Sequence, residues 1–166
     1  MDARPPLLRD GRAPRLPGIV EPMATPVQVV IDCADPARLA GFWADALGYE
    51  IQAPPEGFDT WEDALRAWGV PEDAWNSRSA IVDPDEAGPR IFFQQVPEQK
   101  TVKNRVHLDV NAGGPQGTPP EERRRRVEAE AERLASLGAS VFREVEERGE
   151  HWIVMQDPEG NEFCVQ

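Results

Sequence analysis

His107 and Glu162 are the side chains of this chain best suited to moving a proton or holding a metal ion. His107 is one of only two histidines and lies in the apolar stretch NRVHLDV, which reads as a strand. It is either a metal ligand or proton-transfer residue, or a hydrogen-bonded side chain of a pocket or core. Glu162 lies in the closing strand, where apolar neighbours could raise its pKa and make it a general base. A solvated or ion-paired glutamate is the alternative.

The second histidine and the two cysteines are weaker candidates. His151 follows the charged loop EERGE, so we expect it to be exposed. Cys33 and Cys164 lie in apolar, strand-like contexts without a C-x-x-C motif, which favours reduced, buried thiols over a disulfide. No helix N-terminus or obvious base lies beside Cys164 in the sequence, so nothing predicts that its thiol is an activated nucleophile.

Composition excludes several classes of protein. The chain has 166 residues and carries 30 acidic against 18 basic side chains, for a net charge of -12. Such an acidic protein would repel the phosphates of nucleic acid, and the run of four arginines at 123–126 is better explained as a solvated helix start with i,i+4 glutamate partners. No apolar run approaches the ~20 residues of a membrane span, and residues 1–22 lack the apolar core of a signal peptide. We predict a cytoplasmic protein without nucleic-acid or membrane partners.

Hydrophobic periodicity predicts one domain built from a duplicated unit. Residues 1–26 are rich in Pro, Arg and Gly and are predicted to be a flexible leader. Module one, 27–97, reads strand–helix–strand–strand–strand, with a helical insertion at 59–76. Module two, 104–166, repeats the order, and the two together form a single domain over 27–166.

End signals mark the helix of each module. Asp35 can cap the first helix, with Pro36 in its first position and Gly48 at its end. Thr118 and Glu121 have the spacing of a capping box at the start of the second helix.

The duplicated order resembles the vicinal oxygen chelate superfamily, which includes glyoxalase I, extradiol dioxygenases and bleomycin-resistance proteins. The stretches DCADPARLAGFWADALGYE, KTVKNRVHLDV and DPEGNEFCV carry the resemblance, which is strongest to glyoxalase-like domain proteins. It implies an α+β fold in which two βαβββ modules form a shared, cupped sheet. It also implies a small-molecule ligand inside the cup and a homodimer.

The resemblance further implies a divalent metal held by one residue from each of four strands. Gln28 and His107 stand at two of these positions and are neutral donors, whereas Phe92 and Cys164 stand where the superfamily has carboxylates. Mg²⁺ and Mn²⁺ draw on carboxylate oxygens, so the sequence leaves the cofactor open.

Two other sets of metal ligands are possible from residues next to the superfamily positions. Period-two alternation puts Gln94 on the face of Phe92 and Glu162 on the face of Cys164, which allows a shifted set of Gln28, Gln94, His107 and Glu162. A set of Cys164, His107 and Glu162 would suit zinc. The metal candidates are therefore Gln28, His107 and Glu162.

Two functional hypotheses follow from the resemblance. In the first, the protein is an enzyme of the lyase or dioxygenase-like kind that acts on a small organic molecule in the cup, with His107 and Glu162 as the catalytic residues. In the second, it is a metal-free protein that binds or sequesters such a molecule, as bleomycin-resistance proteins do, and the missing carboxylates favour this second hypothesis. Trp61 and Trp68 of the insertion either close the cup as a lid or pack at its edge. The residues predicted to line the pocket are Gln28, Trp61, Trp68, Phe92, Gln94, Trp152 and Cys164.

Overall fold

The computed structural model describes residues 25–166, so the leader predicted at 1–26 lies almost wholly outside the described residues. The first module contains β1 (Val29–Cys33), α1 (Pro36–Leu47), β2 (Glu50–Ile51), α2 (Trp61–Ala67), the 3-10 helix η1 (Glu72–Ser77), β3 (Arg78–Val82) and β4 (Ile91–Gln95). The second contains β5 (Asp109–Val110), α3 (Pro120–Ser136), β6 (Ser140–Glu147), β7 (Glu150–Gln156) and β8 (Glu162–Val165). The duplicated βαβββ order predicted from the sequence is confirmed.

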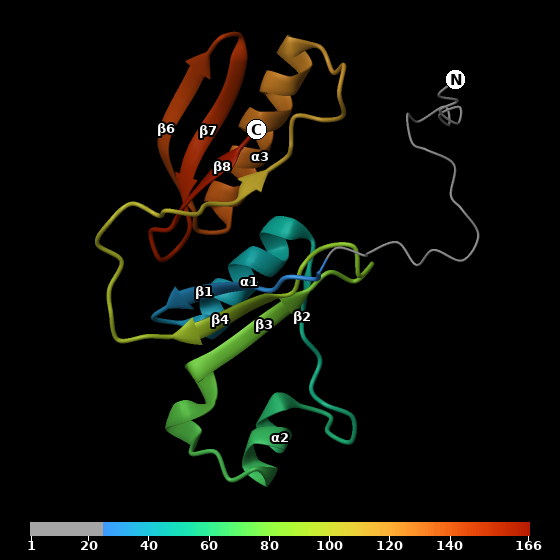
Figure 1. Ribbon diagram of the computed structural model, residues 1–166, viewed down its shortest axis with the longest axis vertical. Helices are drawn as coiled ribbons and strands as arrows, with labels where there is room; N and C mark the ends of the chain where they lie inside the picture. Colours follow the sequence, from blue (N-terminus) through green and yellow to red (C-terminus); the bar gives the residue numbers. More distant parts are fainter. Residues whose placement is uncertain (1–24) are drawn as a thin grey trace, which may run out of the picture.

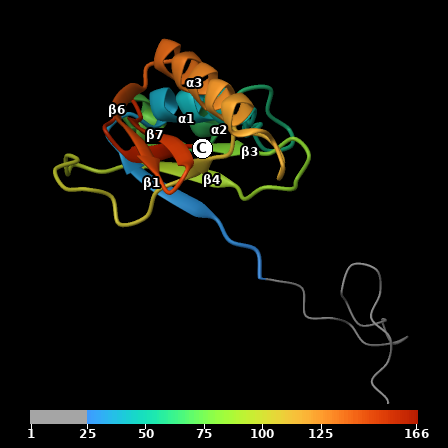
Figure 2. The same cartoon turned by 90° about the horizontal axis from the view of Figure 1, so that it is seen from above.

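Each module forms its own four-stranded sheet. The strand orders are β1-β4-β3-β2 and β5-β8-β7-β6, so the two sheets have the same topology. In each sheet the first strand runs parallel to the last one, and the remaining pairs are antiparallel. Figure 1 shows the second module above the first, and Figure 2 shows α1 and α3 on the same side of the sheets. The α+β fold with two modules is therefore as predicted.

The end signals of α1 act as the sequence predicts, but those of α3 do not. The Asp35 side chain accepts a hydrogen bond from the backbone N–H of Arg38, and Gly48 ends the helix with φ of 70°, a left-handed value that suits glycine. The capping box predicted for α3 is absent, because this helix begins at Pro120 and the Thr118 hydroxyl donates instead to the Pro115 carbonyl. The segment TPP, residues 118–120, thus follows a turn that the Thr118 side chain stabilises, and it does not cap α3.

Trp43 of α1 joins the two modules. Its indole ring packs edge-on against Phe163 of β8, with ring centroids 5.1 Å apart, and only 2% of the residue is exposed. Its Nε1–H donates to the carboxylate of Asp157, which is 4% exposed and also accepts from the backbone and side chain of Asn161. One buried cluster of apolar side chains therefore runs through both modules.

The second module also contacts both ends of α1. At the N-terminal end, the Glu159 carboxylate accepts hydrogen bonds from the backbone N–H groups of Ala34 and Asp35, at 2.8 and 2.7 Å. At the C-terminal end, the Arg133 guanidinium donates to the carbonyls of Asp45 and Ala46, both at 3.0 Å. A negative charge at the start of a helix and a positive charge at its end both stabilise the helix dipole.

Within residues 25–166, no helix has the length and hydropathy needed to cross a bilayer.

The Trp43–Asp157 hydrogen bond should contribute measurably to folding. We expect Trp43→Phe to lower the free energy of unfolding by about 2–4 kcal/mol, because it removes a donor to a buried carboxylate and leaves a smaller ring in the core. Urea denaturation followed by circular dichroism measures the change. Trp68→Phe is the matched control, since Trp68 is 55% exposed and should change stability by roughly 0.5 kcal/mol or less. Equal effects of the two changes would contradict this account.

Candidate functional site

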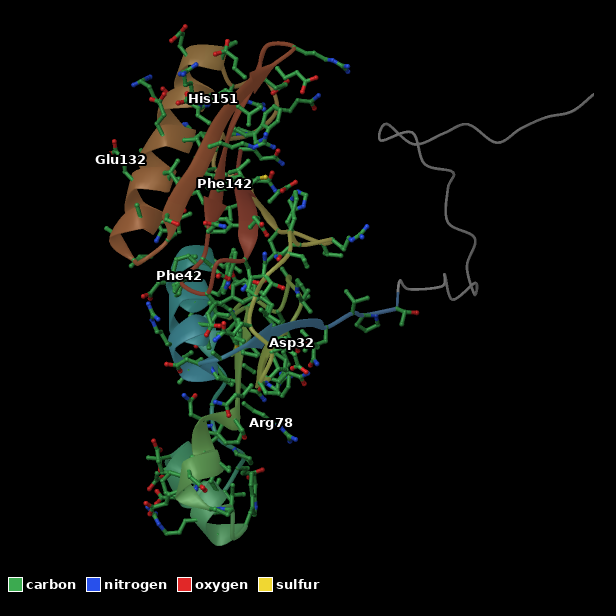
Figure 3. All side chains as sticks on the ribbon, turned by 90° about the vertical axis from the view of Figure 1, so that its left-hand side faces the viewer. Asp32, Phe42, Arg78, Glu132, Phe142 and His151 are labelled. Atoms are coloured by element: carbon green, nitrogen blue, oxygen red, sulfur yellow. The ribbon has the colours of Figure 1, made fainter. Side chains whose placement is uncertain are left out.

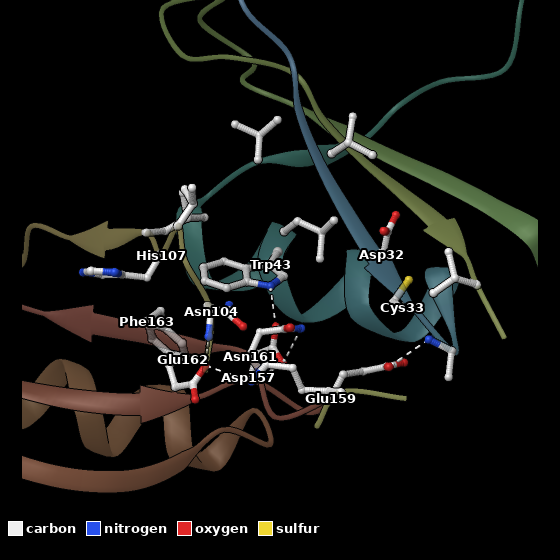
Figure 4. A pocket seen from close by; sticks show the side chains of 18 of the residues that line it. Asp32, Cys33, Trp43, Asn104, His107, Asp157, Glu159, Asn161, Glu162 and Phe163 are labelled. Atoms are coloured by element: carbon white, nitrogen blue, oxygen red, sulfur yellow. Dashed lines mark hydrogen bonds and ion pairs between the residues drawn. The ribbon is translucent and has the colours of Figure 1, made fainter. Parts of the chain in front are cut away.

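A hollow of about 640 Å³ lies where the two modules meet (Figure 4). Three of its walls come from β1, from the connection between the modules and from the turn between β7 and β8. Apolar side chains dominate the wall from β1, with Val29, Val30 and Ile31, and Val106 and Leu108 add apolar surface before β5. Its volume falls within the range of roughly 300–1,000 Å³ found for small-molecule sites.

The polar part of this hollow is strongly acidic. Five carboxylates line it against a single ammonium group, that of Lys100; the acidic residues are Asp32, Glu98, Asp157, Glu159 and Glu162. Figure 4 shows Asp157 beneath the Trp43 indole and Glu159 reaching toward the start of α1. The hollow thus offers an apolar surface beside an excess of negative charge.

Glu162 lines the hollow as an ionised, fully partnered carboxylate. It accepts from the backbone N–H of Asn104 and from Lys100 Nζ, both at 3.0 Å. These contacts, with the Asn104 N–H as the largest cause, lower the pKa of Glu162 to about 2. The expectation that apolar neighbours raise this pKa is therefore wrong, because β8 places the carboxylate next to two donors from the inter-module connection. Such a carboxylate is a weak base at neutral pH.

His107 stands at the margin of the hollow. Its imidazole is 43% exposed, points away from the side chains around Trp43 (Figure 4), and lies 3.3 Å from a carboxylate oxygen of Asp109. Cys164 of β8 is the neighbour of Asp109 across the parallel strand pair. Ligand atoms of His107, Asp109 and Cys164 all lie within 4.8 Å of one another. Sequence reasoning overlooked Asp109, although the H-x-D spacing would put both side chains on one face of the strand predicted there. In the structure that strand is shorter than predicted: β5 covers only Asp109–Val110, and His107 lies before it.

Neither cysteine is bonded to another, in agreement with the sequence. Burial and the nearby Asp109 carboxylate raise the pKa of the Cys164 thiol, while burial and neighbouring carboxylates raise the pKa of Cys33 to about 12. Both thiols are protonated at neutral pH, so neither is an activated nucleophile.

The residues proposed as metal ligands in the first module are engaged elsewhere. The Arg90 guanidinium donates to the Gln28 side chain and lies 5.1 Å above the ring of Phe92. Gln94 donates to Asp32 at 2.8 Å. Gln28, Phe92 and Gln94 do not line the hollow.

The shifted set of four ligands therefore does not assemble. A fixed guanidinium beside Gln28 and Phe92 would also repel a divalent cation at that side of the cup. The residues of the first module do not fit a hard metal ion such as Mg²⁺ or Mn²⁺, which needs carboxylate oxygens.

The insertion lies at the end of the molecule away from the second module (Figures 1 and 3). Trp61 donates its Nε1–H to the Gln52 carbonyl, and Trp68 packs edge-on against both Trp61 and Phe58. Neither Trp61 nor Trp68 lines the hollow, so the structure corresponds to packing at the edge and not to a lid over this site.

Trp152 and His151 lie around a second, smaller hollow of about 310 Å³. His151 is only 8% exposed, which contradicts the exposed position expected from the sequence. The reason is its place in β7: His151, Ile153 and Met155 are two residues apart in turn, so their side chains point to the same, buried face of the strand. Its Nε2 lies 2.8 Å from a carboxylate oxygen of Glu144.

A family model described as a glyoxalase-like domain matches residues 28–166. The chain belongs to this glyoxalase-like family. Its membership confirms the resemblance to the vicinal oxygen chelate superfamily on which the sequence prediction rests. No curated protein sequence matches it.

Several solved structures share the fold. A possible glyoxalase from Bacillus cereus is 14% identical with a TM-score of 0.54, and 87% of this chain and 99% of that chain are covered. A glyoxalase/bleomycin resistance protein/dioxygenase family enzyme from Burkholderia phytofirmans is 14% identical, with a TM-score of 0.53 and coverages of 83% and 94%. A fosfomycin resistance protein from Listeria monocytogenes, complexed with Mn(II) and a dihydroxypropylphosphonic acid, is 12% identical, with a TM-score of 0.55 and coverages of 87% and 90%. At these identities the likeness concerns the fold.

The partners of Glu162 predict how its carboxyl titrates. In NMR titration we expect a pKa near the value of about 2 given by the structure. Lys100→Met should raise this pKa only in part, because the Asn104 N–H still donates. Since the folded-state pKa lies below the ordinary value, Glu162 stabilises the fold above about pH 4.5, and this contribution is lost as the pH falls toward 2. Comparison with Glu162→Gln across this window isolates the contribution. A pKa at or above the ordinary value would contradict the assignment.

Proposed function

We propose that this glyoxalase-like protein binds a small organic molecule in the hollow between its modules, and that this molecule joins an apolar body to a cationic group. The observation that carries the proposal is the composition of the hollow, where apolar side chains of β1 lie beside five carboxylates and one lysine. Concave, largely apolar sites with a few placed polar groups are typical of small-molecule binding.

The apolar part of the hollow is already exposed without a ligand. Val30 is 49% exposed and Val106 is 79% exposed, and both belong to the wall. Covering such side chains with an apolar group removes their surface from water, which favours binding by roughly 25 cal/mol per Å² before the costs of association.

The charged part selects for a cation. Glu159 is bonded to backbone N–H groups and Glu162 to Lys100 and Asn104, so both have partners. Asp32 accepts only from the neutral amide of Gln94, and within residues 25–166 neither Asp32 nor Glu98 has a salt-bridge partner. Figure 3 places Asp32 on the side of β1 away from α1. A ligand cation would gain from these two carboxylates and would be attracted by the field of the whole hollow.

A catalytic role is the second candidate, and the pairing of His107 with Asp109 supports it. A carboxylate 3.3 Å from Nε2 can orient an imidazole, and the ring borders the hollow. In such an enzyme His107 would move the proton and Glu162 would remain an ionised positioning group rather than a base. The reaction itself is not specified by these groups.

We also propose that the protein is a cytoplasmic homodimer without nucleic-acid or membrane partners. Val141 and Phe142 on the edge strand β6 are 57% and 60% exposed, which supports an association through this edge. The net charge of -12 supports the lack of a nucleic-acid partner.

A pair of matched compounds tests the ligand class. Naphthylmethylamine and naphthylmethanol have nearly the same apolar body, but only the amine is cationic at pH 7. We expect calorimetry at low salt to show the amine binding at least about fivefold more tightly, a difference that falls as salt screens the carboxylates. Asp32→Asn should reduce the preference, whereas Asp59→Asn, the same change at an exposed position outside the hollow, should not.

The position of the site is tested by filling it. Val30→Trp should weaken binding of both compounds about tenfold or more, because the larger side chain occupies the wall of the hollow. Val27→Trp makes the same substitution at a residue that is 71% exposed and does not line the hollow, so it should leave binding unchanged. Saturable binding that is equally strong in both variants would place the site elsewhere, and no binding of either compound would reject the proposal.

A further inference from the structure

His107, Asp109 and Cys164 bring three different kinds of metal ligand to one point on the second sheet. Asp109 and Cys164 are direct neighbours in the parallel pair of β5 and β8, and the Cys164 N–H donates to the Leu108 carbonyl at 2.9 Å. His107 lies two residues before Asp109, just ahead of β5, and its Nε2 is 3.3 Å from a carboxylate oxygen of Asp109. The ligand atoms of all three side chains lie within 4.8 Å of one another.

We propose that His107, Asp109 and Cys164 form a Zn²⁺ site contained in the second module. Imidazole nitrogen, carboxylate oxygen and thiolate sulfur are the three ligand types that zinc accepts in proteins. One carboxylate and one thiolate would together balance the charge of the ion, and the Cys164 thiol would lose its proton on binding. Three protein ligands leave the fourth tetrahedral position for water or a bound molecule, and His107 borders the hollow.

The geometry requires only small adjustments. Ligands at about 2.0–2.3 Å from a tetrahedral zinc ion lie roughly 3.3–3.8 Å from one another, and the His107–Asp109 separation is already 3.3 Å. His107 and Asp109 are 43% and 42% exposed, so their side chains can rotate without disturbing the core.

This ligand set differs from the four-strand arrangement that the superfamily resemblance implies. It takes no residue from the first module, where the Arg90 guanidinium covers Phe92 and bonds Gln28. It includes Asp109, which has no counterpart among the four positions, and it replaces a carboxylate by a thiolate. These differences favour zinc over the harder ions.

A second cluster of possible metal ligands is a weaker candidate for a metal site. Glu128, Glu144 and His151 also approach within 4.8 Å of one another. However, the Arg124 guanidinium lies among them and donates to Glu128 at 2.9 Å and to Glu144 at 2.6 Å. Because a cation already satisfies these carboxylates, a metal ion would have to displace it.

Metal titration of the purified, reduced and chelator-treated protein tests the proposal. We expect one equivalent of Zn²⁺ to be taken from a chromophoric chelator. Co²⁺ in place of zinc should give the intense near-ultraviolet band of thiolate-to-cobalt charge transfer and the visible bands of a tetrahedral ion. Asp109→Asn, Cys164→Ser and His107→Gln should each weaken zinc binding by about 100-fold or more, since losing a residue that merely supports a ligand already costs roughly 10–100-fold. Cys164→Ser should also abolish the charge-transfer band.

Three control variants separate this site from the alternatives. Cys33→Ser removes the other thiol, and Gln28→Ala and Glu162→Gln remove residues of the four-strand and shifted sets, so all three should retain zinc affinity and the cobalt spectrum. Circular dichroism confirms that each variant is folded. Absence of stoichiometric zinc, a cobalt complex without the thiolate band, or a larger loss in Gln28→Ala or Glu162→Gln than in Asp109→Asn would overturn the proposal. The titrations contain no organic ligand, so their failure leaves the amine-binding proposal standing.

Discussion

The contact between Trp43 and the β7–β8 turn determines how the two modules sit against each other. The indole is buried on Phe163, and its one polar atom is directed to Asp157, a carboxylate that the turn itself holds through Asn161. A buried indole without an acceptor, or a buried carboxylate without donors, would be costly, so the pair fixes one orientation of α1 on the second module. The hollow forms beside this contact, and Trp43, Asp157 and Phe163 all line it.

Charge in the hollow is organised by the same turn and by the connection between the modules. Backbone N–H groups, which cannot be lost by side-chain substitution, hold Glu159 and contribute to holding Glu162. Glu159 is thus partnered by backbone groups, whereas Glu162 also uses Lys100, one of the few basic residues of an acidic chain. Within residues 25–166, Asp32 on β1 and Glu98 in the connection line the hollow without a backbone N–H or salt-bridge partner, which leaves the net charge of the hollow negative.

Local patterns in the sequence predicted the elements well. The stripe of Leu39, Phe42 and Trp43 with its flanking Asp35 and Gly48 predicted α1, and the repeated order predicted the two sheets. The composition of the site was less accessible, because it depends on pairs far apart in the chain, such as Asn104 with Glu162. His151 shows the limit at short range: the charged loop before it favours an exposed position, whereas the alternation of β7 turns its side chain to the buried face.

The interdependence of the halves also bears on how such a chain can change over time. The dipole of α1 is complemented at one end by Glu159 and at the other by Arg133, so charges of the second module add to the cap that Asp35 of the first module provides. The two repeated units therefore stabilise each other through contacts that cross between them. Recombination that exchanged one half for that of a relative would have to bring along the matching acid and base, which makes the whole domain, and not the module, the unit of inheritance.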